Sequence, residues 1–238
     1  MNVDMRKIML KSLLHAIFPS YCLLCAHNTK RPEQICIQCE SLLPWIQISC
    51  IQCAAPIIKS DITYCGSCLS NPSDIDHTTC IFTYTQPIRH WVKLYKYHDQ
   101  LHFKRLFSYW MAKTTNHRRN NIDLIIPVPI HTKKQRQRGY NQCDLIGKEI
   151  ASKLNIEYSR NTLIKNINTP PQTSLKKKER ERNIHNSFSV KKDINQLRIA
   201  VVEDVITTGS TIRSISKILK KNGAARVEIW AIARTQEQ

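Results

Sequence analysis

The sequence predicts an α/β domain with a mainly parallel sheet, preceded by a small cysteine-rich module. Eight of the ten cysteines form four CxxC pairs between Cys22 and Cys68. From residue 78 onward, short apolar runs alternate with segments of helical periodicity. Such alternation is typical of parallel sheets, whose crossovers are usually helical. We therefore expect two domains, an N-terminal helix with the cysteine-rich module at residues 1–72 and the α/β domain at residues 73–238.

The four CxxC pairs are separated by 10, 10 and 11 residues. Two such turns supply the four thiolates of a closed tetrahedral zinc site, so the spacing predicts two structural zinc ions. The predicted ligands are Cys22, Cys25, Cys36, Cys39, Cys50, Cys53, Cys65 and Cys68. A redox dithiol is the alternative for one CxxC pair, but four evenly spaced pairs argue against it. We expect the first two CxxC pairs to bind one zinc ion and the last two pairs to bind the other. An interleaved assignment of the pairs to the two ions stays open.

The remaining elements follow from periodicity. Runs of β-forming residues predict strands at residues 78–85, 123–129, 197–202 and 226–233. Helical spacing predicts helices at residues 5–17, at 87–111 with a break near His98, at 143–154 and at 211–221. Two single cysteines, Cys80 and Cys143, fall within these segments, and we expect both to be buried rather than to bind metal.

The chain is strongly basic, with 36 Lys and Arg against 18 Asp and Glu and a formal charge of +18. Such a charge favours a polyanionic partner, nucleic acid or a membrane surface, although a merely basic soluble protein is the alternative. No apolar run reaches the roughly 20 residues that span a bilayer, so we expect a cytoplasmic protein. Aromatic and basic residues interleave at residues 89–110, as in single-strand binders, but a buried helix face is the favoured interpretation.

The most specific motif runs from Val201 to Thr211, where a strand leads into two carboxylates and a turn of small hydroxylated residues. A turn of this kind before a helix binds phosphate through backbone N–H groups, and a glycine allows close approach. Carboxylates at a strand end can hold ribose hydroxyls, directly or through Mg²⁺. An N-capped helix is the alternative for the turn alone. The candidate phosphoribosyl-binding residues are Glu203, Asp204, Thr207, Thr208, Gly209, Ser210 and Thr211.

This motif resembles the diphosphoribosyl-binding signature of type I phosphoribosyltransferases, in which the acid pair holds the ribose and the loop holds the 5′-phosphate. Three further segments narrow the resemblance: PVPIH at 127–131, RQRGYNQ at 136–142 and TPPQT at 169–173. Together with the CxxC pairs, they make the chain similar to the ComF family of competence proteins. The resemblance implies a double zinc ribbon followed by a type I phosphoribosyltransferase-like fold.

The resemblance also implies where a diphosphate would bind. The loop after the strand at 123–129 and a catalytic flap are the expected places, although a solvated basic loop is the alternative for the first. The candidate residues are His131, Arg136, Arg138, Arg180 and Arg182.

By the same resemblance, the function is handling of imported single-stranded DNA in natural transformation. Its expected location is the cytoplasm, at the inner face of the inner membrane. The expected partners are single-stranded DNA, the DNA-uptake channel and recombination proteins. A second hypothesis is an active phosphoribosyltransferase that uses phosphoribosyl diphosphate and Mg²⁺ with an acceptor that the sequence does not identify. A third, weaker one is a zinc-ribbon adaptor that docks partner proteins.

Overall fold

A computed structural model describes residues 20–31, 33–58, 61–131, 135–136, 138–166 and 187–236. The chain divides into two compact units, Met1–Leu43 and Pro44–Gln238, so the second group of four cysteines belongs to the same unit as the sheet. The boundary that we expect at residue 72 stays a prediction. The helix predicted at residues 5–17 lies outside the described residues. Within the described ranges, no helix is long and apolar enough to cross a membrane.

The order of elements agrees closely with the periodicity. The smaller unit contains α2 (Ile37–Ser41). The larger unit contains α3 (Gly66–Ser70), β1 (His77–Thr83), α4 (Ile88–Tyr97), α5 (Phe103–Thr115), η1 (Asn116–Asn121), β2 (Leu124–Pro127), α7 (Gln142–Leu154), β3 (Glu157–Tyr158), β4 (Leu163–Lys165), β5 (Phe188–Val190), β6 (Arg198–Ile206), α9 (Ser210–Lys221) and β7 (Arg226–Arg234). The predicted break near His98 is confirmed, because α4 ends at Tyr97 and α5 begins at Phe103.

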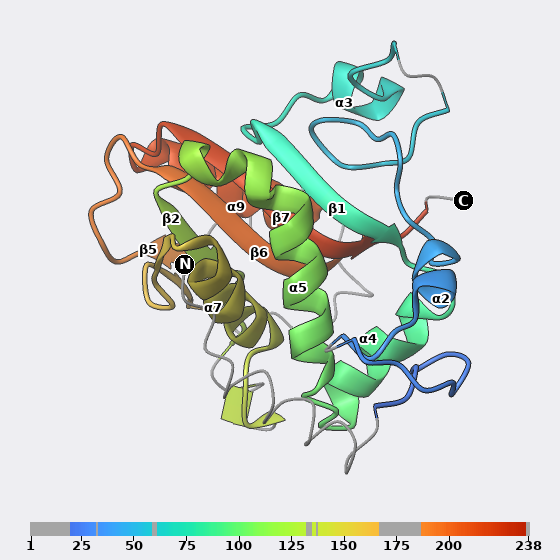
Figure 1. Cartoon of the computed structure of the whole chain (residues 1–238). Coiled ribbons are helices and arrows are strands. Elements are labelled where there is room, and N and C mark those ends of the chain that lie inside the picture. The colour runs from blue at the N-terminus through green and yellow to red at the C-terminus, as the bar shows by residue number, and fades with distance from the viewer. Residues whose placement is uncertain are drawn as a thin grey trace, which may run out of the picture. The chain divides into compact units, whose positions relative to one another are not determined.

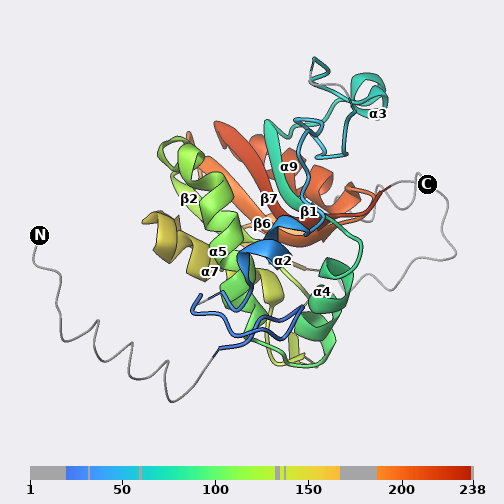
Figure 2. The same ribbon diagram turned by 45° about the vertical axis from the view of Figure 1, so that its right-hand side comes forward.

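The main sheet of the larger unit has the strand order β1-β7-β6-β2-β3, and every neighbouring pair is parallel. Helices α5 and α7 cover one face of this sheet and α9 covers the other (Figures 1 and 2). Strands β4 and β5 form a separate antiparallel pair. The predicted class, α/β with a mainly parallel sheet after a cysteine-rich module, is confirmed. The carboxyl ends of β2 and β6 lie side by side, which is where ligands bind in open sheets of this kind.

The core lies between the sheet and its two helical layers. All residues of β7 after Arg226 are buried, as expected for a strand covered on both faces. Helix α7 approaches the sheet closely at Gly147, where an added Cβ would lie 3.2 Å from the ring of Tyr158. The first turn of α7 lies beside the carboxyl ends of β2 and β6, since Asn141 donates to the Val128 carbonyl and Cys143 contacts Glu203.

Most aromatic side chains of α4 and α5 belong to the core, although Tyr97 is exposed. Trp91, Tyr95, Phe103 and Trp110 are all buried, and Trp91 stacks between Phe103 and Trp110 with ring centroids 5.8 and 6.3 Å away. The favoured interpretation of residues 89–110 as a buried helix face is therefore confirmed. These four rings do not form a stacking platform for nucleic-acid bases.

Candidate functional site

The smaller unit is organised around one group of four cysteines. The Sγ atoms of Cys22, Cys25, Cys36 and Cys39 all lie within 4.8 Å of one another. Backbone N–H groups point at the sulfurs, since Cys36 N donates to Cys22 Sγ and Cys39 N donates to Cys36 Sγ, each at 3.4 Å. Donors of this kind stabilise thiolates, which are the species that bind metal.

The second group belongs to the larger unit and consists of Cys50, Cys53, Cys65 and Cys68, also within 4.8 Å of one another. Its first pair is tied to the sheet, because Thr78 of β1 donates to the backbone oxygens of Ile51 and Gln52 at 2.7 Å. The second zinc ribbon is thus anchored to the strand that follows it.

The donor sets of both groups fit a structural zinc ion. Each group offers four sulfur ligands, which suits tetrahedral Zn²⁺ and leaves no position open for a substrate. The groups are sequential along the chain, so the expected sequential pairing agrees with the structure and the interleaved alternative does not. The two single cysteines, Cys80 and Cys143, are buried, as predicted.

The two candidate carboxylates lie inside β6, near its carboxyl end. The strand continues through Glu203 and Asp204 to Ile206, with Glu203 opposite Ala231 of β7. Lys96 of α4 reaches this point, and its Nζ lies 2.8 Å from Asp204 Oδ1. The thiol of Cys143, in the first turn of α7, donates to Glu203 Oε1 at 3.5 Å. Three elements therefore converge on the acid pair.

Burial governs the charges at this point. Burial and the neighbouring Asp204 charge raise the pKa of Glu203 to about 8. Burial alone would lower the pKa of Lys96, but the Asp204 carboxylate outweighs it, and the pKa is raised. Burial also raises the pKa of Cys143, with Glu203 and Asp204 adding to the effect. At neutral pH the site thus holds an ammonium and a protonated thiol beside the carboxyl groups.

The loop after β6 is fixed by contacts among its own residues and with the first turn of α9. Gly209 has a φ of +74°, in the left-handed region that favours glycine, and it precedes the first turn of α9. The hydroxyls of Thr208 and Ser210 lie 3.1 Å apart, and Arg213 Nη2 donates to the Thr208 carbonyl at 2.7 Å. The loop therefore carries hydroxyls, a helix amino end and a guanidinium, which together suit a phosphate.

Some of the basic candidates can be placed in the structure and others cannot. Arg138 lies over the ring of Tyr97, with its Cζ 4.8 Å from the ring centroid. Arg136 is exposed, and His131 is partly buried at the end of the loop after β2. Arg180 and Arg182 lie outside the described residues, so their role in a flap stays a prediction.

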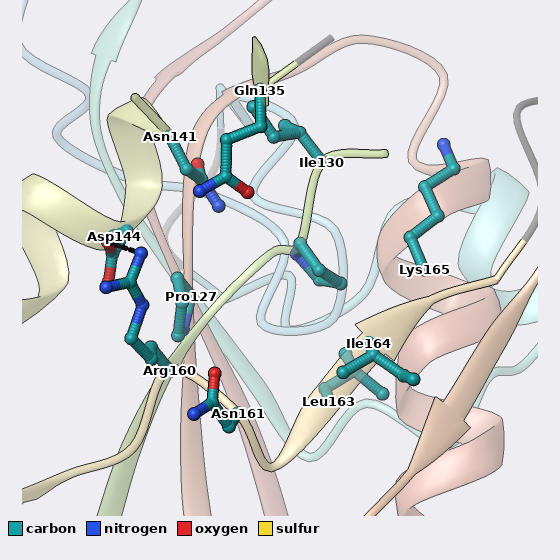
Figure 3. A pocket seen from close by; sticks show the side chains of 11 residues that line it. Pro127, Ile130, Gln135, Asn141, Asp144, Arg160, Asn161, Leu163, Ile164 and Lys165 are labelled. Atoms are coloured by element: carbon teal, nitrogen blue, oxygen red, sulfur yellow. Dashed lines mark ion pairs between the residues drawn. The ribbon is translucent and has the colours of Figure 1, made fainter. Parts of the chain in front are cut away.

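A pocket of about 380 Å³ lies at the carboxyl end of β2, on the side of that strand that faces β3. Figure 3 shows the Arg160 guanidinium turned toward Asp144, an ion pair of 3.0 Å, with Lys165 on the opposite side of the pocket. Cys143, which contacts Glu203, and Asp144, which lines the pocket, are adjacent in α7, so the acid pair and this pocket lie beside the same turn of that helix. The pocket lining is Pro127, Pro129, Ile130, Gln135, Asn141, Asp144, Arg160, Asn161, Leu163, Ile164 and Lys165.

Sequence reasoning missed three residues of the site. Lys96 belongs to a helix that precedes the sheet strands β2 and β6, and its amphipathic pattern gave no sign that it reaches Asp204. The burial of Cys143 was predicted, but its contact with Glu203 was not. Arg213 could have been found, because a cation one turn into the helix after a Gly-containing loop lies near the loop's backbone.

Comparisons with known proteins agree with this organisation. The double zinc ribbon domain family model matches residues 13–69. The chain is 34% identical over 180 residues to Competence protein F of Haemophilus influenzae, covering 72% of this chain and 78% of the relative. It is 27% identical over 206 residues to DNA utilization protein YhgH of Escherichia coli K12, covering 84% of this chain and 90% of the relative.

Similar solved structures include two phosphoribosyltransferases. The purine phosphoribosyltransferase from Pyrococcus horikoshii has a TM-score of 0.37 and 14% identity, covering 56% of this chain and 84% of that one. A hypoxanthine phosphoribosyltransferase from Staphylococcus aureus has a TM-score of 0.36 and 10% identity, and the match covers 54% of this chain and 62% of that one. The family follows from the sequence relatives. With a relative 34% identical across 78% of its length, the chain belongs to the ComF family of competence and DNA utilization proteins.

Proposed function

We propose that the chain handles imported single-stranded DNA in natural transformation or DNA utilization, and that it binds a ribose phosphate at the end of β6. The observation that supports a ribose-phosphate site is the acid pair, Glu203 and Asp204, which shortly precedes the loop that Gly209 and Arg213 shape. The names of the relatives, competence protein and DNA utilization protein, support the DNA role.

The chemistry of the pocket supports a sugar phosphate over other anions. The Asp204 carboxylate accepts hydrogen bonds from hydroxyls, and Glu203, whose pKa of about 8 keeps it mainly protonated at neutral pH, can both donate and accept one, so the pair suits the vicinal hydroxyls of ribose. The following loop offers the hydroxyls of Thr208 and Ser210 and the amino end of the 12-residue helix α9, which suit a phosphate. A phosphate alone would leave the acid pair unexplained.

The charge of the chain supports a nucleic-acid partner. A formal charge of +18 favours phosphate-backbone contacts, which are insensitive to base sequence. Because Trp91, Tyr95, Phe103 and Trp110 are buried, base stacking on these four rings is not part of the proposal. We place the protein in the cytoplasm, where the DNA-uptake channel and recombination proteins would be its partners.

The DNA role is tested in a strain that lacks the protein and is complemented with the wild-type gene. We expect transformation, or growth on DNA as a nutrient, to fail in the deletion strain and to return on complementation. Purified zinc-loaded protein should bind single-stranded DNA with an affinity that falls steeply as salt rises. Normal transformation in the deletion strain, or salt-insensitive binding, would contradict this part of the proposal.

A second candidate function is transfer of ribose 5-phosphate from phosphoribosyl diphosphate to an acceptor. The pocket of about 380 Å³ beside the acid pair supports it, since this volume suits a small molecule and its Asn141, Arg160 and Asn161 offer polar contacts. Pyrophosphate release from phosphoribosyl diphosphate, measured with each common nucleobase, tests this function. Pyrophosphate release that depends on the nucleobase and on Asp204 would support this function. Release that is no faster with a nucleobase than without one would contradict it.

A further inference from the structure

We infer that the Lys96 ammonium takes the place of a divalent cation in the ribose-phosphate site, so that the chain binds ribose 5-phosphate without Mg²⁺. The inference rests on the proposed function of the acid pair, and it specifies that the ligand binds as a metal-free sugar phosphate. Its basis is the position of Lys96 relative to Asp204 and the kinds of ligand atoms around them.

The position of Lys96 is built into the fold. Its Nζ lies 2.8 Å from Asp204 Oδ1, and the two side chains are only 19% and 10% exposed. The preceding residue, Tyr95, is buried and donates from its hydroxyl to the backbone oxygen of Gln142 at 3.1 Å. Tyr140 in turn donates to the backbone oxygen of Tyr95 at 2.7 Å. These bonds fix the last turn of α4 against the start of α7, so the ammonium is directed at β6.

The surrounding atoms do not fit Mg²⁺. Cys143, Glu203 and Asp204 offer one sulfur and carboxylate oxygens within 4.8 Å of one another. Mg²⁺ requires a near-octahedral shell of oxygen ligands, including several waters, and a thiol is a poor ligand for it. A cation at Asp204 would also meet the ammonium of Lys96, which already neutralises that carboxylate. The site therefore resembles one in which the cation is part of the protein.

An ammonium can neutralise Asp204 and bind ligand oxygens, as a divalent cation would. It carries three N–H donors, so Lys96 can hold Asp204 and also donate to a ribose hydroxyl or phosphate oxygen. A ribose 5-phosphate has no diphosphate that would bring its own Mg²⁺ to the site. The structure therefore favours a ligand with ribose hydroxyls and a single phosphate, held by the acid pair, Lys96 and the loop at Thr208.

The test measures the Kd of ribose 5-phosphate by calorimetry on full-length, zinc-loaded protein, with and without Mg²⁺. Divalent cations are removed from the buffer on a resin beforehand, because a chelator in the sample would strip the cysteine sites. We expect the wild-type Kd to change by less than about twofold on addition of Mg²⁺. Lys96→Met should weaken binding by about tenfold or more without Mg²⁺, as expected for a lost charged hydrogen bond, and added Mg²⁺ should not restore the affinity, because the atoms around Asp204 do not suit this ion.

Two variants act as controls. Lys93→Met removes an exposed lysine from the same helix and should bind like the wild type, and Lys96→Arg keeps the charge and should stay independent of Mg²⁺. Wild-type binding that requires Mg²⁺ overturns the inference and leaves the proposed pocket standing. Unchanged Mg²⁺-free binding by Lys96→Met also overturns it. If the wild type binds no ribose 5-phosphate in either buffer, both the proposed ribose-phosphate site and this inference are overturned. If Lys96→Met fails to fold, the wild-type comparison still decides the matter.

Discussion

Replacing Glu228 tests how the amino-terminal side of the sheet is stabilised. The Glu228 side chain lies on β7 and is completely buried. Arg118 donates to both of its carboxylate oxygens at 2.8 Å, and Arg226 donates to Oε1 at 2.8 Å. Trp230 Nε1 donates to Oε2 at 3.3 Å. One carboxylate thus pairs with two guanidinium groups and joins η1 to the sheet.

Glu228→Ala should lower the free energy of unfolding of the larger unit by about 3–5 kcal/mol. The loss arises mainly from Arg118, whose side chain is only 15% exposed and would be left without its carboxylate. Arg226 is more exposed and contributes less. Since domains are typically stable by about 5–15 kcal/mol, a loss of this size is readily measured by urea denaturation of zinc-loaded protein.

Glu149→Ala is the matched control. Its carboxylate pairs with Lys104 and Lys153 at 3.7 Å each, and its side chain is 23% exposed. Pairs this long and this accessible to water contribute at most about 1 kcal/mol, so the control should lose little stability. Equal losses for Glu228→Ala and Glu149→Ala would refute the argument that the buried Glu228 carboxylate stabilises the two arginines beside it.

Three further perturbations test other parts of the structure. Cys50→Ser should reduce the zinc content by atomic absorption from two ions per chain to one, because it breaks only the second group of cysteines; loss of both ions would refute independent sites. Gly209→Ala should destabilise the loop by about 1–2 kcal/mol, because its φ of +74° is unfavourable for alanine, and should weaken ribose 5-phosphate binding; unchanged affinity would argue against the loop as the phosphate site. Burial, with Arg118 nearby, lowers the pKa of His77 to about 4. Between about pH 6.5 and pH 4, His77 is therefore protonated in the unfolded chain but not in the native chain, so the free energy of unfolding should fall as the pH drops through that window. His77→Gln should reduce the slope of the melting temperature against pH in the same window. An unchanged slope would show that other groups cause the pH dependence.

The fold could be predicted largely because its signals are local. The apolar run of β2 and the helical spacing of α7 identify each element without knowledge of its neighbours. The end of β6 could not be predicted in this way. Glu203 and Asp204 interrupt the apolar run after Val202, yet the strand continues because it pairs with β7 as far as Ile206. A contact that no local pattern reveals, the one between Lys96 and Asp204, compensates the buried charge.

The candidate site could be predicted only in part for the same reason. The loop from Thr207 to Thr211 is contiguous, so its residue types alone indicate a phosphate site. Lys96 and Cys143 come from α4 and α7, and only the folded chain brings them to the acid pair. The four-cysteine groups were predictable because each CxxC turn is local and the pairs are evenly spaced.

The central claim, that the acid pair serves DNA handling through a ribose-phosphate pocket, is tested most directly by transformation frequency. The strain carries Glu203→Ala with Asp204→Ala in place of the wild-type gene, and protein level and zinc content are measured alongside. We predict that the frequency falls toward that of the deletion strain while protein and zinc stay at wild-type levels. A wild-type frequency in that strain would contradict the claim.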